Sequence, residues 1–543
     1  MFFETMLTKQ WIDEMAASGL WTDEHLFDRF RSKAVVNGNS PLIIDRQGQL
    51  SWADAARIVD DLSRGFLEIG VGRADVVQLQ LPNRREFVLC VLALERIGAV
   101  VNPVAPIFRS NEVTVMSELA RPVAVVTVES FRNFDLAGMH LDLREQCPWV
   151  KQVIVVPTEP GTSAPADTMS WDDIIATGQH SSLSDQALDL LRPEPNDVCE
   201  IIFTSGTTGQ PKGVMHTQNT MNAAADVWLN RIAPDCTVFH MASTLAHQTG
   251  YLYGIRTAIS AGGRVVYQEV WDAVEFAELI EVHGIEASMG ATPFLADLMA
   301  VDGLEQRDLS SFKAFVCAGA TIPLPVLEQA RDTLPCTVMP GWGMTEMGLA
   351  TSGRRDDPFE KLATDGFGFP DSEVRVVDDD GQPVSAGEEG DLQYRGSLSF
   401  VGYAQGRELS ESCWRDGWFD TGDRAIVDND GYIKISGRTK DIVIRGGENI
   451  PVKEVEDVLI RHPSVVNCAI VGKPHDRLGE VSCAVILATG KAPNLAELTV
   501  FLEEQKVTRQ FWPEALRVVD EFPMTPSGKI QKYKLRDLVT EDA

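Results

Sequence analysis

Long hydrophobic runs are missing from this chain of 543 residues. Its longest apolar stretch, residues 87–101, is interrupted by Glu95 and Arg96, whereas a membrane-spanning helix needs about 20 predominantly apolar residues. The first residues include Glu4 and Lys9, and no uninterrupted apolar segment follows them. The sequence therefore predicts neither a transmembrane segment nor a signal peptide, and we expect a cytoplasmic protein.

Positive charge is also scarce. The chain has 48 Lys and Arg against 79 Asp and Glu, which gives a formal net charge of −31. Nonspecific binding of nucleic acid needs a basic surface, and an anionic membrane attracts basic segments, so neither partner is expected. Small anions are not excluded, because a few basic groups can dominate the potential of one cleft.

Cysteine pairs of the metal-binding type are absent as well. Nine cysteines occur, but no two form a C-x-x-C motif. Several lie in apolar stretches, as Cys90 does between Leu89 and Val91, which predicts buried, reduced thiols.

The first two-thirds of the chain alternate short apolar runs with amphipathic segments. Strand-like runs cover residues 76–81, 123–128, 153–156, 263–267 and 314–317, and helix-like segments include residues 53–67 and 273–282. This alternation predicts an α/β fold with layered sheets. Residues 10–32 are expected to be helical, with Trp11, Ile12 and Met15 on one face.

The pattern changes beyond about residue 370, where Asp-Asp-Gly and Asn-Asp-Gly turns indicate β-hairpins. A compact unit begins at Lys440, with a helix expected over residues 452–461 and a strand over residues 465–471. Because 543 residues are too many for one core, we expect two domains, residues 1–439 and 440–543.

A loop rich in glycine and hydroxyl groups carries the first chemical signal. Residues 204–213 read T-S-G-T-T-G-Q-P-K-G and follow the apolar run 201–203. Backbone N–H groups, hydroxyls and Lys212 could surround a polyphosphate, which suggests a nucleoside triphosphate. The spacing is not that of a Walker A loop, and an ordinary surface loop is the structural alternative.

Five further motifs follow in order, at residues 341–346 (G-W-G-M-T-E), 421–423 (T-G-D), 437–441 (G-R-T-K-D), 446–450 (G-G-E-N-I) and 523–529 (P-M-T-P-S-G-K). With the glycine-rich loop, their order and spacing resemble the acyl-adenylate-forming superfamily, which includes acyl-CoA synthetases, luciferases and adenylation domains of peptide synthetases. The resemblance covers most of the chain. It implies an acid–CoA ligase with a large N-terminal domain of layered α/β sheets and a β-barrel-like part, and a small, mobile α+β C-terminal domain.

The chemistry of such a ligase needs charge and positioning and no protein nucleophile. A carboxylate attacks the α-phosphate of ATP, which makes its oxygen a leaving group, and the CoA thiol then displaces AMP. Because two anions meet while pyrophosphate departs, positive charge and Mg²⁺ are the main catalytic requirements.

The resemblance assigns roles in the first half-reaction residue by residue. It places the β- and γ-phosphates against Lys212 and the loop residues Thr204, Ser205, Gly206, Thr207, Thr208 and Gly209. It makes Glu346 the Mg²⁺ ligand and Thr345 a donor to the α-phosphate or the carboxylate. It stacks adenine on Trp342, next to Gly343, beside the backbone of Ala318, Gly319 and Ala320. It assigns the ribose to Asp423 and Arg438, and the bridge between carboxylate and α-phosphate to Lys529.

The second half-reaction requires the small domain to move, because Lys529 lies on the side from which CoA must arrive. The resemblance makes Lys440 the hinge and lets Gly446 and Gly447 replace the lysine, so that pantetheine can pass close to the backbone. Core packing is the alternative role for Trp342, and a tight hairpin turn for the two glycines.

The sequence constrains the identity of the acid less than that of ATP or CoA. The resemblance places His247, Gly290 and Met344 at the acyl pocket, and nearby segments are mostly apolar or small. Arg256 is the nearest cation in sequence, and nothing marks it as facing the pocket. This favours a neutral, apolar acid, and the sequence is most similar to bacterial short- to medium-chain and cyclohexanecarboxylate CoA ligases.

Several alternatives stay open. The substrate could be a longer-chain or aromatic acid, or the acyl group could be loaded onto a carrier protein. A regulatory protein that binds ATP without turnover is disfavoured by the presence of Lys529 and Glu346. A homodimer also remains open.

Overall fold

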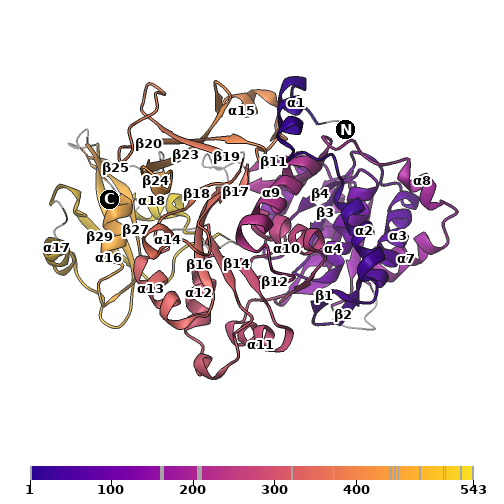
Figure 1. Cartoon of the computed structure of the whole chain (residues 1–543), viewed down its shortest axis with the longest axis horizontal. Helices are drawn as coiled ribbons and strands as arrows, with labels where there is room; N and C mark the ends of the chain where they lie inside the picture. The colour runs from indigo at the N-terminus through magenta and orange to yellow at the C-terminus, as the bar shows by residue number, and fades with distance from the viewer. Residues whose placement is uncertain are drawn as a thin grey trace.

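The computed structural model describes residues 3–158, 164–204, 211–319, 322–370, 372–438, 443–445, 448–450, 452–475, 479–505, 507, 509–525 and 529–540. Within these ranges the chain forms two large sheets, a smaller antiparallel sheet and a C-terminal sheet (Figure 1). The short strands β6 (Ser130–Phe131) and β7 (Phe134–Asp135) form a separate hairpin.

The first large sheet has the order β21-β11-β10-β4-β3-β5-β8-β9. Its strands are β3 (Val76–Gln80), β4 (Val100–Pro103), β5 (Ala124–Val128), β8 (Gln152–Val156), β9 (Met169–Ser170), β10 (Val198–Thr204), β11 (Lys212–Thr217) and β21 (Gly402–Tyr403). Pairing is parallel from β10 through β4, β3, β5 and β8 to β9, whereas β11 pairs antiparallel with both β10 and β21. The parallel strands are apolar runs because both faces of this sheet are covered.

The second large sheet has the order β18-β17-β16-β15-β14-β12-β13-β1-β2. Its strands are β1 (Pro41–Asp45), β2 (Gly48–Ser51), β12 (Val238–Met241), β13 (Arg264–Val266), β14 (Ala287–Gly290), β15 (Ala314–Ala318), β16 (Thr337–Met344), β17 (Gly348–Ser352) and β18 (Phe367–Gly368). Parallel pairing runs from β1 through β16.

Helices cover both sheets and separate them. The helices that precede the C-terminal unit are α1 (Lys9–Ser18), α2 (Leu26–Asn37), α3 (Trp52–Glu68), α4 (Arg85–Arg96), α5 (Ser110–Ala120), α6 (Leu136–Gln146), α7 (Trp171–Gln179), α8 (Asp185–Asp189), α9 (Gln218–Ile232), α10 (Gln248–Ala261), α11 (Ala273–His283), α12 (Thr292–Met299), α13 (Leu324–Thr333), α14 (Phe359–Leu362) and α15 (Arg407–Glu411). Helix α9 contacts both β11 and β17, so it lies between the two sheets (Figure 1).

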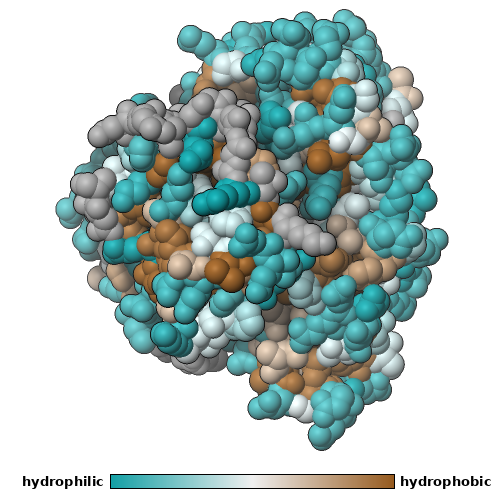
Figure 2. Space-filling view, turned by 90° about the vertical axis from the view of Figure 1, so that its left-hand side faces the viewer, coloured by the Kyte–Doolittle hydropathy of each residue, from teal (hydrophilic) through white to brown (hydrophobic). Residues whose placement is uncertain are grey.

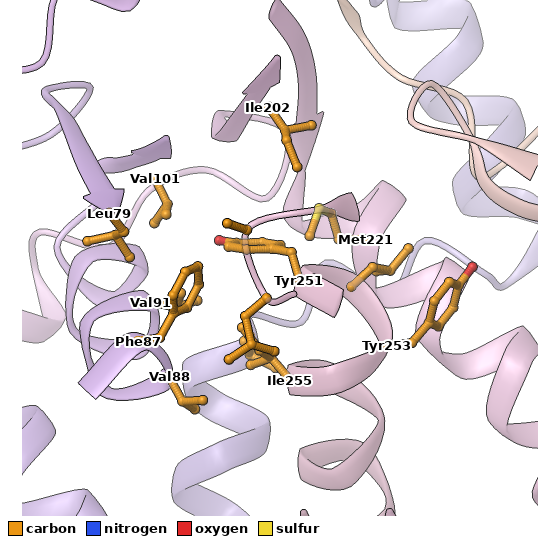
Figure 3. Close-up of a cluster of buried hydrophobic side chains, with 14 of the residues drawn as sticks. Leu79, Phe87, Val88, Val91, Val101, Ile202, Met221, Tyr251, Tyr253 and Ile255 are labelled. Atoms are coloured by element: carbon orange, nitrogen blue, oxygen red, sulfur yellow. The ribbon is translucent and has the colours of Figure 1, made fainter. Parts of the chain in front are cut away.

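The largest hydrophobic cluster fills the space around α4 and α10. Phe87 of α4 packs edge-on against Tyr251 of α10, with ring centroids 6.3 Å apart, and Val91 and Ile255 lie beside them (Figure 3). All four side chains are almost inaccessible to solvent. Residues 87–101, the longest apolar stretch, therefore supply the centre of the core.

A smaller antiparallel sheet and a C-terminal unit follow. The sheet has the order β19-β20-β23-β22, with β24 paired to β23, and it forms the part expected to be barrel-like. Its strands are β19 (Ser372–Val377), β20 (Glu389–Gly396), β22 (Trp414–Arg415), β23 (Trp418–Val427) and β24 (Ile433–Arg438).

The C-terminal unit has its own core and the sheet order β26-β25-β28-β27, with β29 beside β28. It consists of β25 (Val443–Arg445), β26 (Glu448–Ile450), α16 (Val452–Leu459), β27 (Val465–His475), β28 (Gly479–Ala488), α17 (Leu495–Glu504), β29 (Ala515–Val519) and α18 (Lys532–Thr540). The face that this unit presents is mostly hydrophilic, and its hydrophobic residues form separate small groups (Figure 2).

The α/β class and the large and small parts of the fold are confirmed. Residues 10–32 were expected to be helical, and this holds only in part, because α1 ends at a left-handed Gly19 and α2 begins only at Leu26. The nine cysteines all lie in the described ranges, none of them forms a disulfide, and all but Cys413 are buried. Among the helices of the described ranges, none is long and apolar enough to cross a membrane.

Candidate active site

The glycine-rich loop connects β10 to β11, and its two ends are held together. Thr204 ends β10 and pairs with Lys212, which begins β11. Gln405 braces the same point, since its amide accepts from the Gly213 N–H at 3.1 Å and donates to the Pro211 carbonyl at 2.7 Å. Ser205, Gly206, Thr207, Thr208 and Gly209 lie outside the described residues.

Tyr403 links Lys212 to Glu346. Its hydroxyl donates to Glu346 Oε1 at 2.8 Å, and Lys212 Nζ lies 4.7 Å from the centre of its ring. Burial, together with the Glu346 carboxylate, raises the pKa of Tyr403 well above its ordinary value, so the phenol remains a hydrogen-bond donor. The phenol of Tyr403 therefore contacts both a cation and a buried carboxylate.

His216 fixes the backbone immediately before Glu346. Its Nε2 donates to the Thr345 carbonyl at 2.8 Å, while Nδ1 lies 3.1 Å from the hydroxyl of Thr220. Burial lowers the pKa of His216 to about 4, so the ring is neutral at pH 7. Thr345 follows the end of β16, so this contact holds the backbone just beyond the strand.

Trp342 and Asp423 meet between two different sheets. The indole Nε1 of Trp342, on β16, donates to Asp423 Oδ2, on β23, at 2.8 Å. The neighbouring Gly343 is required by its surroundings, because an added Cβ would lie 1.9 Å from the Gly348 carbonyl oxygen. Asp423 is directly opposite Arg438 in the β23–β24 pairing, but the side chain of Arg438 is not among those described.

Lys529 lies against the end of β15. Ala318 ends that strand, Gly319 follows with φ +97°, and a Cβ added at Gly319 would lie 3.5 Å from Lys529 Cε. The main chain of this lysine is held within the C-terminal unit, since the Lys529 backbone N–H donates to Thr525 Oγ1 at 3.0 Å. Ala320, and the expected hinge and CoA residues Lys440, Gly446 and Gly447, lie outside the described residues.

His247 lies close enough to Lys529 to be influenced by its charge. Burial, together with that charge, lowers the pKa of His247 to about 4. The residue caps α10, and its Nδ1 accepts from the Thr249 N–H at 3.4 Å.

The other two expected pocket residues end neighbouring parts of the second sheet. Gly290 ends β14, where an added Cβ would lie 2.9 Å from the Phe294 ring, and the half-buried Met344 ends β16. Arg256 does not face this region as a free cation, because its Nη2 donates to Glu95 Oε1 at 2.6 Å in the core.

Three residues of this arrangement were not identified from the sequence: Tyr403, His216 and Gln405. Tyr403 is 57 positions from Glu346 along the chain, and His216 is 129 positions from Thr345. No local motif signals either contact, because each depends on how β11, β16 and β21 are arranged in space.

Comparison with known proteins adds the family. The family described as AMP-binding enzyme matches residues 30–404, and the AMP-binding enzyme C-terminal domain matches residues 454–529. The chain belongs to the AMP-binding enzyme family. It is thus an ATP-dependent, adenylate-forming enzyme of the acyl- and aryl-CoA ligase type, which confirms the resemblance drawn from the six motifs.

Named relatives span two kinds of acid. The chain is 32% identical to the medium-chain fatty-acid–CoA ligase of Escherichia coli over 95% of this chain and 91% of that protein. It is 30% identical to the 2,3-dihydroxybenzoate-AMP ligase of Bacillus subtilis over 98% and 97%. The crystal structure of the anthranilate CoA ligase AuaEII with anthranoyl-AMP shares the fold, with a TM-score of 0.85, 23% identity and coverage of 96% and 98%.

Proposed function

We propose that this enzyme joins a neutral, apolar carboxylic acid to CoA through an acyl-adenylate, releasing AMP and pyrophosphate. The preferred acids are a saturated ring such as cyclohexanecarboxylate or a short- to medium-chain fatty acid. The observation that carries the proposal is the position of Lys529 against Gly319 and near His247. A mobile cation between a nucleotide segment and an acyl segment is what the first half-reaction needs.

In that half-reaction the positive charges act on the phosphates. Lys212 holds the β- and γ-phosphates at the end of the glycine-rich loop, and Thr345 donates to the α-phosphate or the carboxylate. Lys529 bridges the attacking carboxylate and the α-phosphate, so that it neutralises charge where the new bond forms. Trp342 stacks on the adenine. Asp423 accepts hydrogen bonds from the ribose hydroxyls, and Arg438 also contacts the ribose.

Mg²⁺ fits this arrangement as a partner of the nucleotide. Glu346 is 6% exposed and offers a hard oxygen donor, and Tyr403 connects it to Lys212. Mg²⁺ is usually bound by one or two carboxylates together with substrate phosphates and waters, so a single protein carboxylate suffices. The ion would neutralise the departing pyrophosphate, while Tyr403 keeps the Glu346 carboxylate in place.

The second half-reaction requires the C-terminal domain to rotate relative to the N-terminal domain, about a boundary at 439/440. Lys440 serves as the pivot, and rotation removes Lys529 from the path of the thiol. Gly446 and Gly447 then line the pantetheine path, since glycine lets a narrow chain approach the backbone.

The acid is inferred to be neutral because Arg256, the nearest cation in sequence, is bound to Glu95 in the core. His247 is neutral at pH 7, and Gly290 and Met344 add only small or apolar surface. A second carboxylate on the substrate would find no partner among these residues.

The deciding experiment measures pyrophosphate release with linear, alicyclic and aromatic acids, with and without CoA. We expect the highest kcat/KM with a short or medium chain or a saturated ring, and thioester only when CoA is present. ADP and phosphate as products would reject the ligase mechanism. A preference for hydroxylated aromatic acids, or transfer to a carrier protein and not to CoA, would reject the substrate class.

A further inference from the structure

The aromatic residue of the nucleotide site makes a contact that most aromatic side chains could not make. Trp342 and Asp423 are 7% and 6% exposed, and the indole N–H donates to the carboxylate at 2.8 Å. Phenylalanine could supply a flat ring at this position, but it has no donor. The hydrogen bond is charge-assisted and buried, which is the stronger kind.

The backbone on both sides of this contact is tightly fixed. Gly341 and Gly343 flank Trp342, and an added Cβ would lie 2.7 Å from Leu349 and 1.9 Å from the Gly348 carbonyl oxygen, respectively. Any larger residue at either position would clash with these neighbours, so the backbone on both sides of Trp342 is closely packed.

Asp423 is fixed on its own strand in the same way. Its N–H donates to Thr421 Oγ1 at 3.1 Å, and Thr421 in turn donates to the Leu392 carbonyl at 2.7 Å. With the main chain held, the orientation of the Asp423 carboxylate depends on its side-chain donors, of which the indole is one.

We propose that Trp342 is a positioning residue that orients Asp423 toward the ribose hydroxyls and thereby sets the preference for ribonucleotides over deoxyribonucleotides. The proposal rests on the proposed function, which makes Asp423 the ribose acceptor. A carboxylate can hold two vicinal hydroxyls only when both oxygens face them in a defined plane. Fixing one oxygen with the indole N–H defines that plane before the nucleotide arrives.

The test compares ATP with 2′-deoxy-ATP as substrates of Trp342→Phe. We expect kcat/KM with ATP to fall about tenfold or more, because a buried charge-assisted hydrogen bond is lost. We expect a much smaller loss with 2′-deoxy-ATP, which lacks one of the hydroxyls, so the selectivity ratio should fall severalfold. Equal losses with both nucleotides would mean that Trp342 acts by stacking alone, and would overturn the proposal.

A matched control is Trp271→Phe. The Trp271 indole also donates to an aspartate, Asp297, at 2.9 Å, and neither residue belongs to a nucleotide motif. It should leave the selectivity ratio unchanged. Asp423→Asn should lower the ratio as well, and its effect should not add to that of Trp342→Phe.

Two outcomes distinguish a failure of this proposal from a failure of the proposed function on which it rests. If the unmodified enzyme shows no preference for ATP over 2′-deoxy-ATP, the assignment of Asp423 to the ribose is wrong. If it shows the preference and Trp342→Phe keeps it, only the role of the indole is wrong. Should Trp342→Phe fail to fold, benzothienylalanine at position 342 replaces the N–H by sulfur at nearly constant shape, and the same comparison decides.

Discussion

Replacing Glu200 by glutamine should change how the stability of the protein depends on pH. Glu200 lies on β10, four residues before the end of the strand at Thr204, and its side chain is completely buried. Burial raises the pKa of Glu200 from 4.5 to about 8, against the opposing effects of the Arg256 charge and a hydrogen bond from Gln248. The carboxyl group is therefore mostly protonated in the folded protein at pH 7.

The sign and size of the effect follow from proton linkage. An unfolded chain releases this proton near pH 4.5, whereas the folded protein keeps it until about pH 8. Between these values the folded state binds one more proton, so its stability falls as the pH rises. Each pH unit corresponds to about 1.4 kcal/mol, and the whole window to up to about 5 kcal/mol. Glutamine fills the same space without a proton to lose.

The assay is urea denaturation of the unmodified protein and of Glu200→Gln at about pH 5, 6, 7 and 8. The difference in unfolding free energy should shift in favour of the variant by about 1.4 kcal/mol per pH unit. Glu503→Gln, at an exposed position of α17, is the matched control and should give curves parallel to the unmodified protein. Parallel curves for Glu200→Gln would refute the buried, protonated carboxyl.

Three further predictions concern the reaction. Lys529→Ala should raise the free-energy barrier of adenylation by about 2–4 kcal/mol, yet the variant should still convert synthetic acyl-adenylate to thioester. Equal losses in both half-reactions would contradict a lysine that moves away before the thiol attacks. Tyr403→Phe removes a charge-assisted hydrogen bond to Glu346 and should raise the Mg²⁺ concentration needed for half-maximal rate about tenfold, whereas Tyr394→Phe, which removes a buried hydroxyl elsewhere, should not. Along a series of linear acids, the transition-state stabilisation calculated from kcat/KM should rise by up to about 0.8 kcal/mol per methylene and then drop. His247→Trp should move the optimum to smaller acids. A plateau that His247→Trp leaves unchanged would reject both the compact pocket and the role of His247.

Local patterns were sufficient to predict the strands and the fold class. The run at residues 76–81 became β3 and the run at residues 314–317 became β15, because parallel strands covered on both faces are continuous apolar segments. The amphipathic segment at residues 53–67 became α3 for a similar reason: its buried residues recur at helical spacing. Composition does not indicate where the N-terminal helix ends, because Gly19 ends α1 in a left-handed conformation within an otherwise helical composition.

The nucleotide motifs were also readable, but the contacts that orient them were not. Trp342 and Asp423 each belong to a motif, yet their hydrogen bond joins residues 81 positions apart on different sheets. Tyr403 belongs to no motif that was recognised, and only the pairing of β21 with β11 brings it beside Lys212. Sequence spacing indicates which chemistry is present, whereas the angle at which each group faces the substrate is set by long-range packing.

The buried charges connect the core to the two ends of the candidate site. Arg256 donates to Glu95 at 2.6 Å and lies close enough to Glu200 to lower its pKa against burial. The strand that carries Glu200 ends at the phosphate loop, and the helix that carries Arg256 begins directly after His247. Removing one member of a buried ion pair typically costs 3–5 kcal/mol, so the Arg256–Glu95 pair holds α10 against α4. Gln248, the first residue of that helix, hydrogen-bonds to Glu200, and this contact ties the strand that ends at the glycine-rich loop to the helix that begins after His247.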